Sequence, residues 1–274
     1  MNTTTHILPP QRPELATLEP PKWRTFRTVS ALVLREMGST YGRSPGGYLW
    51  AVLQPLGTVL VLTLAFSYLV RAPALGSSFI LFYATGYLPF DLYSQLATKI
   101  GRSLKYSRAL LAYPGVTWLD AILARFILNF LTLVTVFCVV IYGILMVLDT
   151  GGQIEIGPIM ISIFMAAILG LGIGMTNCLL IGYFPVWERF WEIINRPLFL
   201  ASGIFFLYDD MPPAARAILW WNPLVHVTGE MRTGFYPSYH ASYVSLSYGF
   251  GVGMILMVLS LVFLRRGYRT VIQR

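Results

Sequence analysis

The chain of 274 residues is poor in charge. Only 12% of its residues are Asp, Glu, Lys or Arg, 56% are hydrophobic, and the mean hydropathy is +0.64. Soluble domains carry about twice that share of charged residues. Several apolar runs approach or exceed the roughly 20 residues that a helix needs to cross a bilayer. The composition therefore excludes an ordinary soluble domain and indicates an all-α integral membrane protein.

Cysteine is scarce as well. Cys138 and Cys178 both lie in apolar runs, which excludes a disulfide framework and favours packing roles for both. Residues 1–48 are polar and basic without an apolar run, so we expect no cleaved signal peptide. The net charge of +8 is spread between the apolar runs rather than gathered in one patch, which indicates membrane topology and not nucleic-acid binding.

Two energy sources are missing from the sequence. The pattern G-x-x-x-x-G-K-[ST] is absent, so the chain does not bind ATP through a P-loop. A proton or sodium relay would need several acidic residues within the spans, and Asp91 is the single serious candidate. If the protein is a transporter, its energy must come from another subunit, and we expect no cofactor or metal in this chain.

An amphipathic helix is predicted over residues 22–41. At 100° per residue, Arg24, Arg27 and Arg35 gather on one face, and apolar side chains gather on the other. We expect the helix to lie in the membrane interface with these arginines toward anionic headgroups, and the alternative is a helix docked on a partner. Residues 1–48 then form a cytoplasmic tail and interfacial helix, and residues 49–274 form the transmembrane domain.

Six membrane spans are predicted after this helix. Their ranges are about 49–70, 78–98, 118–148, 158–183, a fifth from near 190, and 243–264. Orientation follows from Lys and Arg, which are enriched on the cytoplasmic side. With both termini inside, sixteen cations lie on that side, against Arg71, Arg216 and Arg232 outside, with Arg125 inside the third span.

The stretch from Leu198 to His226 decides the topology. A further crossing after the acidic pair Asp209 and Asp210 would move the C-terminal arginines outside, and the apolar piece 214–221 is too short to span. We therefore expect a re-entrant helical element between the fifth and sixth spans. Trp220 and Trp221 suit the outer interface, and Glu230 and Arg232 would lie near the exit.

Glycines form two clusters within the spans, Leu169–Met175 and Tyr248–Met254, and each contains G-x-x-x-G. Such spacing lets helices approach closely. We favour packing within one subunit over a seam between subunits.

The segment from Lys99 to Arg125 is basic and cytoplasmic by the charge rule. It breaks at Pro114, after which Thr117 and Asp120 form a predicted capping box. Arg125 either extends toward the inner headgroups, which we favour, or holds an anionic group. The residues expected to couple to an ATPase are Lys99, Arg102, Lys105, Arg108, Tyr113 and Pro114.

Aromatic side chains recur along the second and fifth spans. Sugars stack on aromatic faces, and a sliding polymer needs weak, repeated contacts. For any single residue, we favour a position in the core or facing lipid. As a group, the residues expected to line a channel are Tyr83, Tyr87, Phe90, Tyr93, Phe205 and Phe206.

A different class of function remains open. Asp209, Asp210, His226 and Glu230 fall near one another in the sequence and would suit a glycan-modifying membrane enzyme. Their spacing does not match H-E-x-x-H, and two acids before Pro212 are also an ordinary helix start. We therefore assign no catalytic and no metal residue.

Three stretches resemble the ABC-2-type export permeases, and specifically those that export capsular polysaccharide. They are "SRALLAYPGVTWLDAILARF" (107–126), "YGRSPGGYLWAVLQP" (41–55) and "WNPLVHVTGEMRTGFYPSY" (221–239), and "RPLFLASGIFFLYDDMP" (196–212) fits the fifth span. Together with the regions between them they cover most of the chain in the family's order.

The resemblance implies a homodimer of six-span subunits in the bacterial inner membrane, with separate ATP-binding subunits that carry ATP and Mg. It implies lipid-linked polysaccharide as the cargo, with O-antigen or teichoic acid as the alternative polymers. Membrane lipids are expected contacts, and periplasmic adaptor and outer-membrane export proteins are further partners to test.

Overall fold

The structure is a computed structural model that describes residues 24–40, 46–111, 115–148 and 154–273. Within these ranges it is helical with no strand, as expected. The helices are α1 (Arg24–Thr40), α2 (Gly47–Leu69), α3 (Phe79–Gly101), α4 (Ser103–Tyr106), α5 (Arg108–Leu111), α6 (Trp118–Val147), α7 (Ile156–Tyr183), α8 (Trp187–Leu200), the 3₁₀ turn η1 (Tyr208–Asp210), α9 (Pro213–Leu219), α10 (Pro223–Phe235) and α11 (Leu246–Gln273).

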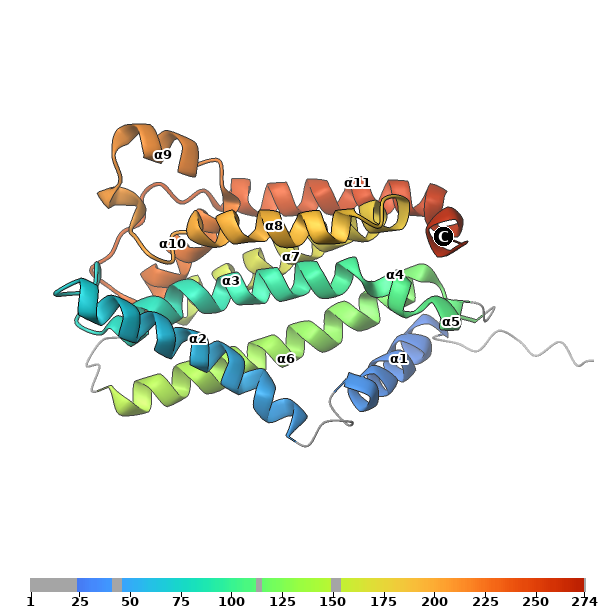
Figure 1. Cartoon of the computed structure of the whole chain (residues 1–274), viewed down its shortest axis with the longest axis horizontal. Helices are drawn as coiled ribbons and strands as arrows, with labels where there is room; N and C mark the ends of the chain where they lie inside the picture. The colour runs from blue at the N-terminus through green and yellow to red at the C-terminus, as the bar shows by residue number, and fades with distance from the viewer. Residues whose placement is uncertain (1–23, 41–45, 112–114, 149–153, 274) are drawn as a thin grey trace, which may run out of the picture.

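The helices α3, α6, α7, α8 and α11 run roughly along the long axis of the molecule, and α2 crosses it obliquely (Figure 1). The short helices α9 and α10 lie at one end, here named the α9 end. The helices α4 and α5 and the C-terminal part of α11 lie at the opposite end, here named the α4 end. The helix α1 lies obliquely beside α6 near the α4 end.

Four of the described helices are long and apolar enough to cross a membrane: α2, α6, α7 and α11. The helix α3 is as long as α2, at 23 residues, but it carries Asp91, Gln95 and Lys99, which lower its hydropathy. The helix α8 has only 14 residues and ends at Leu200, in the middle of the apolar run that predicted the fifth span. The expected count of six spans is thus not confirmed by length and composition.

The core is built around α3, which is buried along most of its length between α2, α6, α7 and α10. Glycines of α7 allow the close approach of α3. A Cβ added at Gly174 would stand 2.8 Å from the Cβ of Ile100, and one at Gly170 would stand 2.8 Å from the Cβ of Leu96. These glycines pack helices of the same subunit, which is the interpretation favoured from the sequence.

Local signals fix several helix ends. The capping box is present: Asp120 N–H donates to the Thr117 hydroxyl over 3.2 Å, and the Asp120 carboxylate accepts from Thr117 N–H over 2.9 Å. Pro213 begins α9, and Pro223 begins α10 after an Asn222 cap. After α8 the chain turns through Gly203, whose φ of 80° is in the left-handed region that favours glycine.

Candidate functional site

A groove of about 440 Å³ opens between α3 and α8. From α3 it receives a hydroxyl, a carboxylate and two aromatic rings; from α8 it receives charged, amide and apolar side chains. Its lining comprises Tyr87, Phe90, Asp91, Ser94, Glu192, Asn195, Arg196, Phe199 and Leu200.

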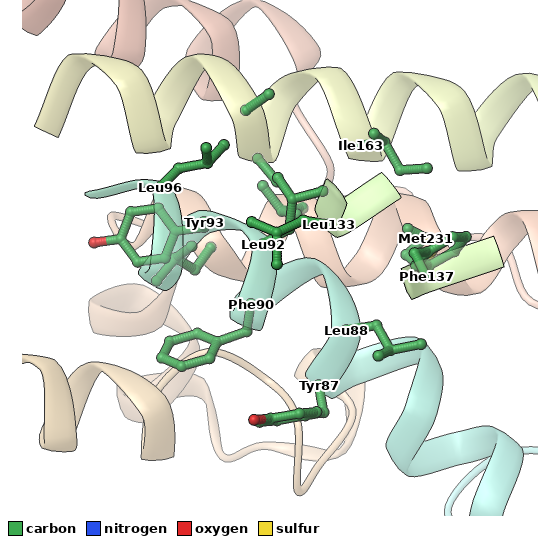
Figure 2. Close-up of a cluster of buried hydrophobic side chains, with 14 of the residues drawn as sticks. Tyr87, Leu88, Phe90, Leu92, Tyr93, Leu96, Leu133, Phe137, Ile163 and Met231 are labelled. Atoms are coloured by element: carbon green, nitrogen blue, oxygen red, sulfur yellow. The ribbon is translucent and has the colours of Figure 1, made fainter. Parts of the chain in front are cut away.

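Two of the expected channel aromatics, Tyr87 and Phe90, line this groove. Figure 2 shows both on the side of α3 that faces away from Leu133 and Phe137 of α6. Phe199 lies edge-on to both rings, with centroids 6.2 Å from Tyr87 and 5.3 Å from Phe90. The groove therefore has an aromatic wall formed by two helices.

The aromatic wall continues toward the α9 end. Phe205 stands edge-on to Phe199, with ring centroids 5.2 Å apart, and it lies 6.5 Å from Tyr83 and 5.4 Å from Phe66 of α2. The helices α2, α3 and α8 and the turn after α8 thus supply one connected row of rings. The sequence did not single out Phe66, because one aromatic in an apolar span gives no signal of its own.

The other two expected aromatics take different positions. Tyr93 is 1% exposed, its ring lies 5.9 Å from Phe90, and its hydroxyl has no hydrogen-bond partner. Phe206 is half-buried, and its carbonyl oxygen accepts a hydrogen bond from Arg232. Neither residue lines the groove in this conformation.

Polar groups at the groove hold one another in place. Asp91 accepts from Gln95 Nε2 over 2.7 Å and from the Tyr87 hydroxyl over 3.3 Å. Asn195 Nδ2 donates to Ser94 Oγ over 2.6 Å. Aromatic faces beside hydroxyl, amide and carboxylate groups are suited to a sugar, which has an apolar ring face and a polar edge.

Arg232 binds the backbone of the non-helical segment that follows α8. Its Nη1 and Nη2 donate to the carbonyl oxygens of Phe206 and Ile204 over 3.0 and 3.1 Å, and its guanidinium lies 4.2 Å from the ring centre of Phe82. The residue is only 2% exposed. An Arg predicted near an exit is therefore a buried donor that satisfies backbone groups left free where the helix stops.

The α9 end carries an aromatic cluster. Trp220 stacks on Tyr248 with centroids 5.0 Å apart and meets Trp221 edge-on at 5.4 Å. Trp221 is 68% exposed, while Trp220 is half-buried. The expected interfacial pair is thus split between a packed ring and an exposed one.

His226 is fully engaged in backbone contacts. Its Nδ1 accepts from the Ser245 N–H over 3.1 Å, so Nε2 carries the proton and donates to the Trp220 carbonyl over 2.8 Å. Asp209 accepts from the Tyr239 hydroxyl over 3.3 Å, and Glu230 is half-buried on α10. Across the described residues no group of His, Cys, Asp and Glu is arranged to hold a metal.

The coupling residues lie at the α4 end, and two of them pair with α8. Arg102 Nε and Nη2 stand 2.7 Å from Glu188 and 2.9 Å from Glu192, and Lys105 Nζ stands 3.1 Å from Glu188. Burial raises the pKa of Glu188, but the hydrogen bond from Lys105 and the charge of Arg102 outweigh it and lower the pKa below its ordinary value. We name these four residues the α4–α8 link.

The remaining coupling residues do not join this link. Lys99 is half-buried on α3, and its carbonyl oxygen accepts from Arg125 Nη1 over 3.2 Å. Arg108 is exposed on α5. Tyr113 and Pro114 lie outside the described residues.

Arg125 of α6 joins that helix to α1. Its Nε stands 2.6 Å from Glu36 of α1, with side chains 8% and 14% exposed, and its guanidinium lies 4.3 Å from the ring centre of Tyr106. A cavity of about 130 Å³ lies beside this pair, between α1, α4 and α6. Arg27 and Arg35 are exposed, as headgroup contacts require, while the side chain of Arg24 is outside the described part.

Sequence reasoning missed Glu36, Glu188 and Glu192. Each pairs with a cation about ninety residues away in the chain. The available signal was modest: Glu188 and Glu192 are four apart, so they share one face of a helix.

Comparison with known proteins decides the class. Residues 27–236 match the family model described as ABC-2 type transporter. The chain belongs to the ABC-2 type transporter family. This ABC-2 permease is 32% identical over 224 residues to the polysialic acid transport protein KpsM of Escherichia coli, covering 81% of this chain and 86% of the relative.

Two further relatives are capsule polysaccharide export inner-membrane proteins. CtrC of Neisseria meningitidis serogroup B is 27% identical over 239 residues, covering 86% of this chain and 89% of the relative. BexB of Haemophilus influenzae is 25% identical over 241 residues, covering 87% and 90%. Membership of the ABC-2 family makes the chain a transport subunit and implies a partner subunit that binds ATP.

Proposed function

We propose that the chain is the membrane subunit of an ATP-driven exporter that moves capsule-type, lipid-linked polysaccharide across the bacterial inner membrane. The observation that carries this proposal is similarity over 81% to 87% of the chain to KpsM, which is named for polysialic acid transport, and to CtrC and BexB, which are named for capsule polysaccharide export. The groove between α3 and α8 supports it, because its aromatic wall and polar groups suit a carbohydrate.

The proposed assembly is a homodimer of permeases above two ATP-binding subunits, which supply ATP and Mg. Both termini are cytoplasmic, so the α4 end faces the ATPases and the α9 end faces the periplasm. Lys99, Arg102, Lys105, Arg108, Tyr113 and Pro114 then lie in the segment that meets the ATPase. Contacts with a periplasmic adaptor and outer-membrane export proteins complete the proposal.

The six-span topology stays part of the proposal. Two facts support it. The helices α3 and α8 run alongside the four apolar spans (Figure 1), and the polar residues of α3 are covered in part by their neighbours, with Asp91 buried and Gln95 and Lys99 half-buried. The segment from α9 to α10 is the re-entrant element, since α9 has seven residues and α10 has thirteen, too few to cross.

The polymer path follows the aromatic wall. We assign Tyr83, Tyr87, Phe90, Tyr93, Phe205 and Phe206 to it, with Phe199 and Phe66 added from the structure. Rings give shallow, repeated stacking contacts without the strong hydrogen bonds that would stop a sliding chain. Movement of α8 relative to α3 would expose the buried members of the set.

The decisive experiment reconstitutes the permease with its ATP-binding subunit in vesicles that contain lipid-linked polysaccharide. ATP-dependent transfer of a capsule-type polymer across the bilayer is the expected result, and the permease alone should transfer nothing. Transfer of O-antigen or teichoic acid in place of the capsule polymer would correct the substrate. Turnover of a glycan by the permease alone, lost in His226→Ala, would replace transport with enzymatic activity.

A further inference from the structure

Apolar side chains of α8, among them Trp191 and Phe199, pack against the core, and a row of polar side chains adds a second set of contacts to its neighbours. The backbones of α3 and α8 stay apart, and long side chains cross the gap between them. On α8 these are Glu188, Glu192 and Asn195, which fall on one helix face at spacings of four and three. They meet Arg102 and Lys105 at the α4 end and Ser94 near the middle of the helix.

The same contact region leaves polar groups unsatisfied. Among the described residues, the buried atoms without a hydrogen-bond partner include Trp191 Nε1 and Asn195 Oδ1 of α8 and Asn177 Nδ2 of α7, which lies beside Trp191. A buried polar group without a partner costs free energy. A contact of this kind separates more readily than one made of matched apolar surfaces, so α8 is the helix best suited to move.

Both ends of α8 permit such movement. Before it, the chain makes a short turn between Tyr183 and Trp187, and after it Gly203 adopts φ of 80°. At its first turn the α4–α8 link joins it to the corner between α3 and α4, where Arg102 is the residue that ends one helix and precedes the other. Glu188 accepts hydrogen bonds from both Arg102 and Lys105, so two contacts restrain the first turn of α8.

We propose that Glu188, supported by Glu192, is a positioning residue that makes α8 follow the α3–α4 corner, so that displacement of the corner by the ATPase widens or narrows the groove. The inference rests on the proposed function, because that function supplies the ATPase and the polymer. In this mechanism Arg102 and Lys105 relay motion within the permease through their carboxylate partners, in addition to any contact with the ATPase.

The test separates coupling from folding. Glu188→Gln removes the charge and keeps the size, and it is assembled with the ATP-binding subunit in the vesicle assay. We expect ATP hydrolysis within about twofold of the unmodified complex and polymer transfer lowered at least about tenfold. The ratio of ATP hydrolysed to polymer transferred therefore rises, which a merely structural role would not produce. Arg189→Gln is the matched control, since Arg189 is exposed on the same turn and takes part in no ion pair within the described ranges.

A charge exchange sharpens the assignment. Arg102→Glu alone should fail like Glu188→Gln, and Arg102→Glu with Glu188→Arg should recover at least about a third of the transfer, because the opposite charges again face each other. If Glu188→Gln does not accumulate in the membrane, Glu192→Gln replaces it, since that side chain is 59% exposed; we then expect a fall of about threefold.

Two results would overturn the inference: full transfer by the Glu188→Gln complex, or transfer and ATP hydrolysis falling in proportion. Failure of the proposed function is recognised separately, because the unmodified complex would then transfer no polymer at all.

Discussion

The helix α3 packs tightly against α7 but only loosely against α8. Against α7, glycines bring the backbones together and the contact is filled with apolar side chains. Against α8, the backbones stay apart around a groove of about 440 Å³, and aromatic and polar side chains bridge it. A transport subunit that must keep its fold while its substrate passes gains from this division: one contact preserves the subunit, and the other is free to change.

The largest effect is expected where the packed contact is forced apart. Gly174→Leu places a side chain where even a Cβ would stand 2.8 Å from that of Ile100, so the free energy of unfolding should fall by about 3 kcal/mol. Membrane accumulation and the detergent melting temperature measure it. Gly143→Leu is the control, because a Cβ there meets nothing within 4 Å. Equal losses in the two variants would contradict the comparison.

Changes at the contact between α3 and α8 should instead lower transport rather than stability. Phe199→Leu removes the ring that joins Tyr87, Phe90 and Phe205 but keeps apolar volume, and we expect polymer transfer to fall about tenfold with accumulation nearly unchanged. Phe199→Tyr keeps the ring and should retain transfer. The vesicle assay compares the two, and a deficit in the Tyr variant as deep as in the Leu variant would argue against stacking.

A pair of hydroxyl and amide substitutions compares the tightly packed helix α7, at its contact with α10, with the groove at a smaller scale. Ser162 of α7 is fully buried and donates to the Val227 carbonyl over 2.7 Å, so Ser162→Ala should cost about 1 to 2 kcal/mol. Asn195→Ala breaks the bond to Ser94 at the groove but also removes the unpaired Oδ1, and we expect a loss below about 0.5 kcal/mol. Thermal unfolding in detergent ranks them, and the reverse order would remove the distinction between the contacts.

The smallest expected effect is that of salt. The α4–α8 link is partly exposed, so raising the salt concentration toward 1 M should weaken it by at most about 1 kcal/mol. The buried pair of Arg125 and Glu36 should resist the same change. Spin labels on α8 and on α1 should report that α8 loosens and that α1 does not. Equal loosening of both helices would mean that solvent exposure does not decide how strongly salt weakens these ion pairs.

Much of the architecture could be predicted because its causes are local. Thr117 and Asp120 are three residues apart and form their capping box within one turn. Length and composition identify α2, α6, α7 and α11, and regularly spaced glycines indicate close packing of α7.

The contents of the candidate site were harder to predict because its contacts are distant in the sequence. The aromatics Tyr87 and Phe90 were expected to line a path, and both lie at the groove. Glu188 was not expected, since nothing near it reveals that Arg102 lies opposite. The end of α8 at Leu200 was missed for the same reason: the apolar run continues past it, and the group that stabilises the break is Arg232 on another helix.

That position of Arg232 has a consequence for how the protein is made. The carbonyl oxygens of Ile204 and Phe206 precede their guanidinium partner by 28 and 26 residues. During synthesis the apolar run after Trp187 therefore emerges while those oxygens still lack their donor, and within a bilayer an unsatisfied carbonyl favours a continued helix. We therefore expect the segment after α8 to adopt its broken form only after α10 has joined it, so that these two parts of the chain enter the membrane together rather than one after the other.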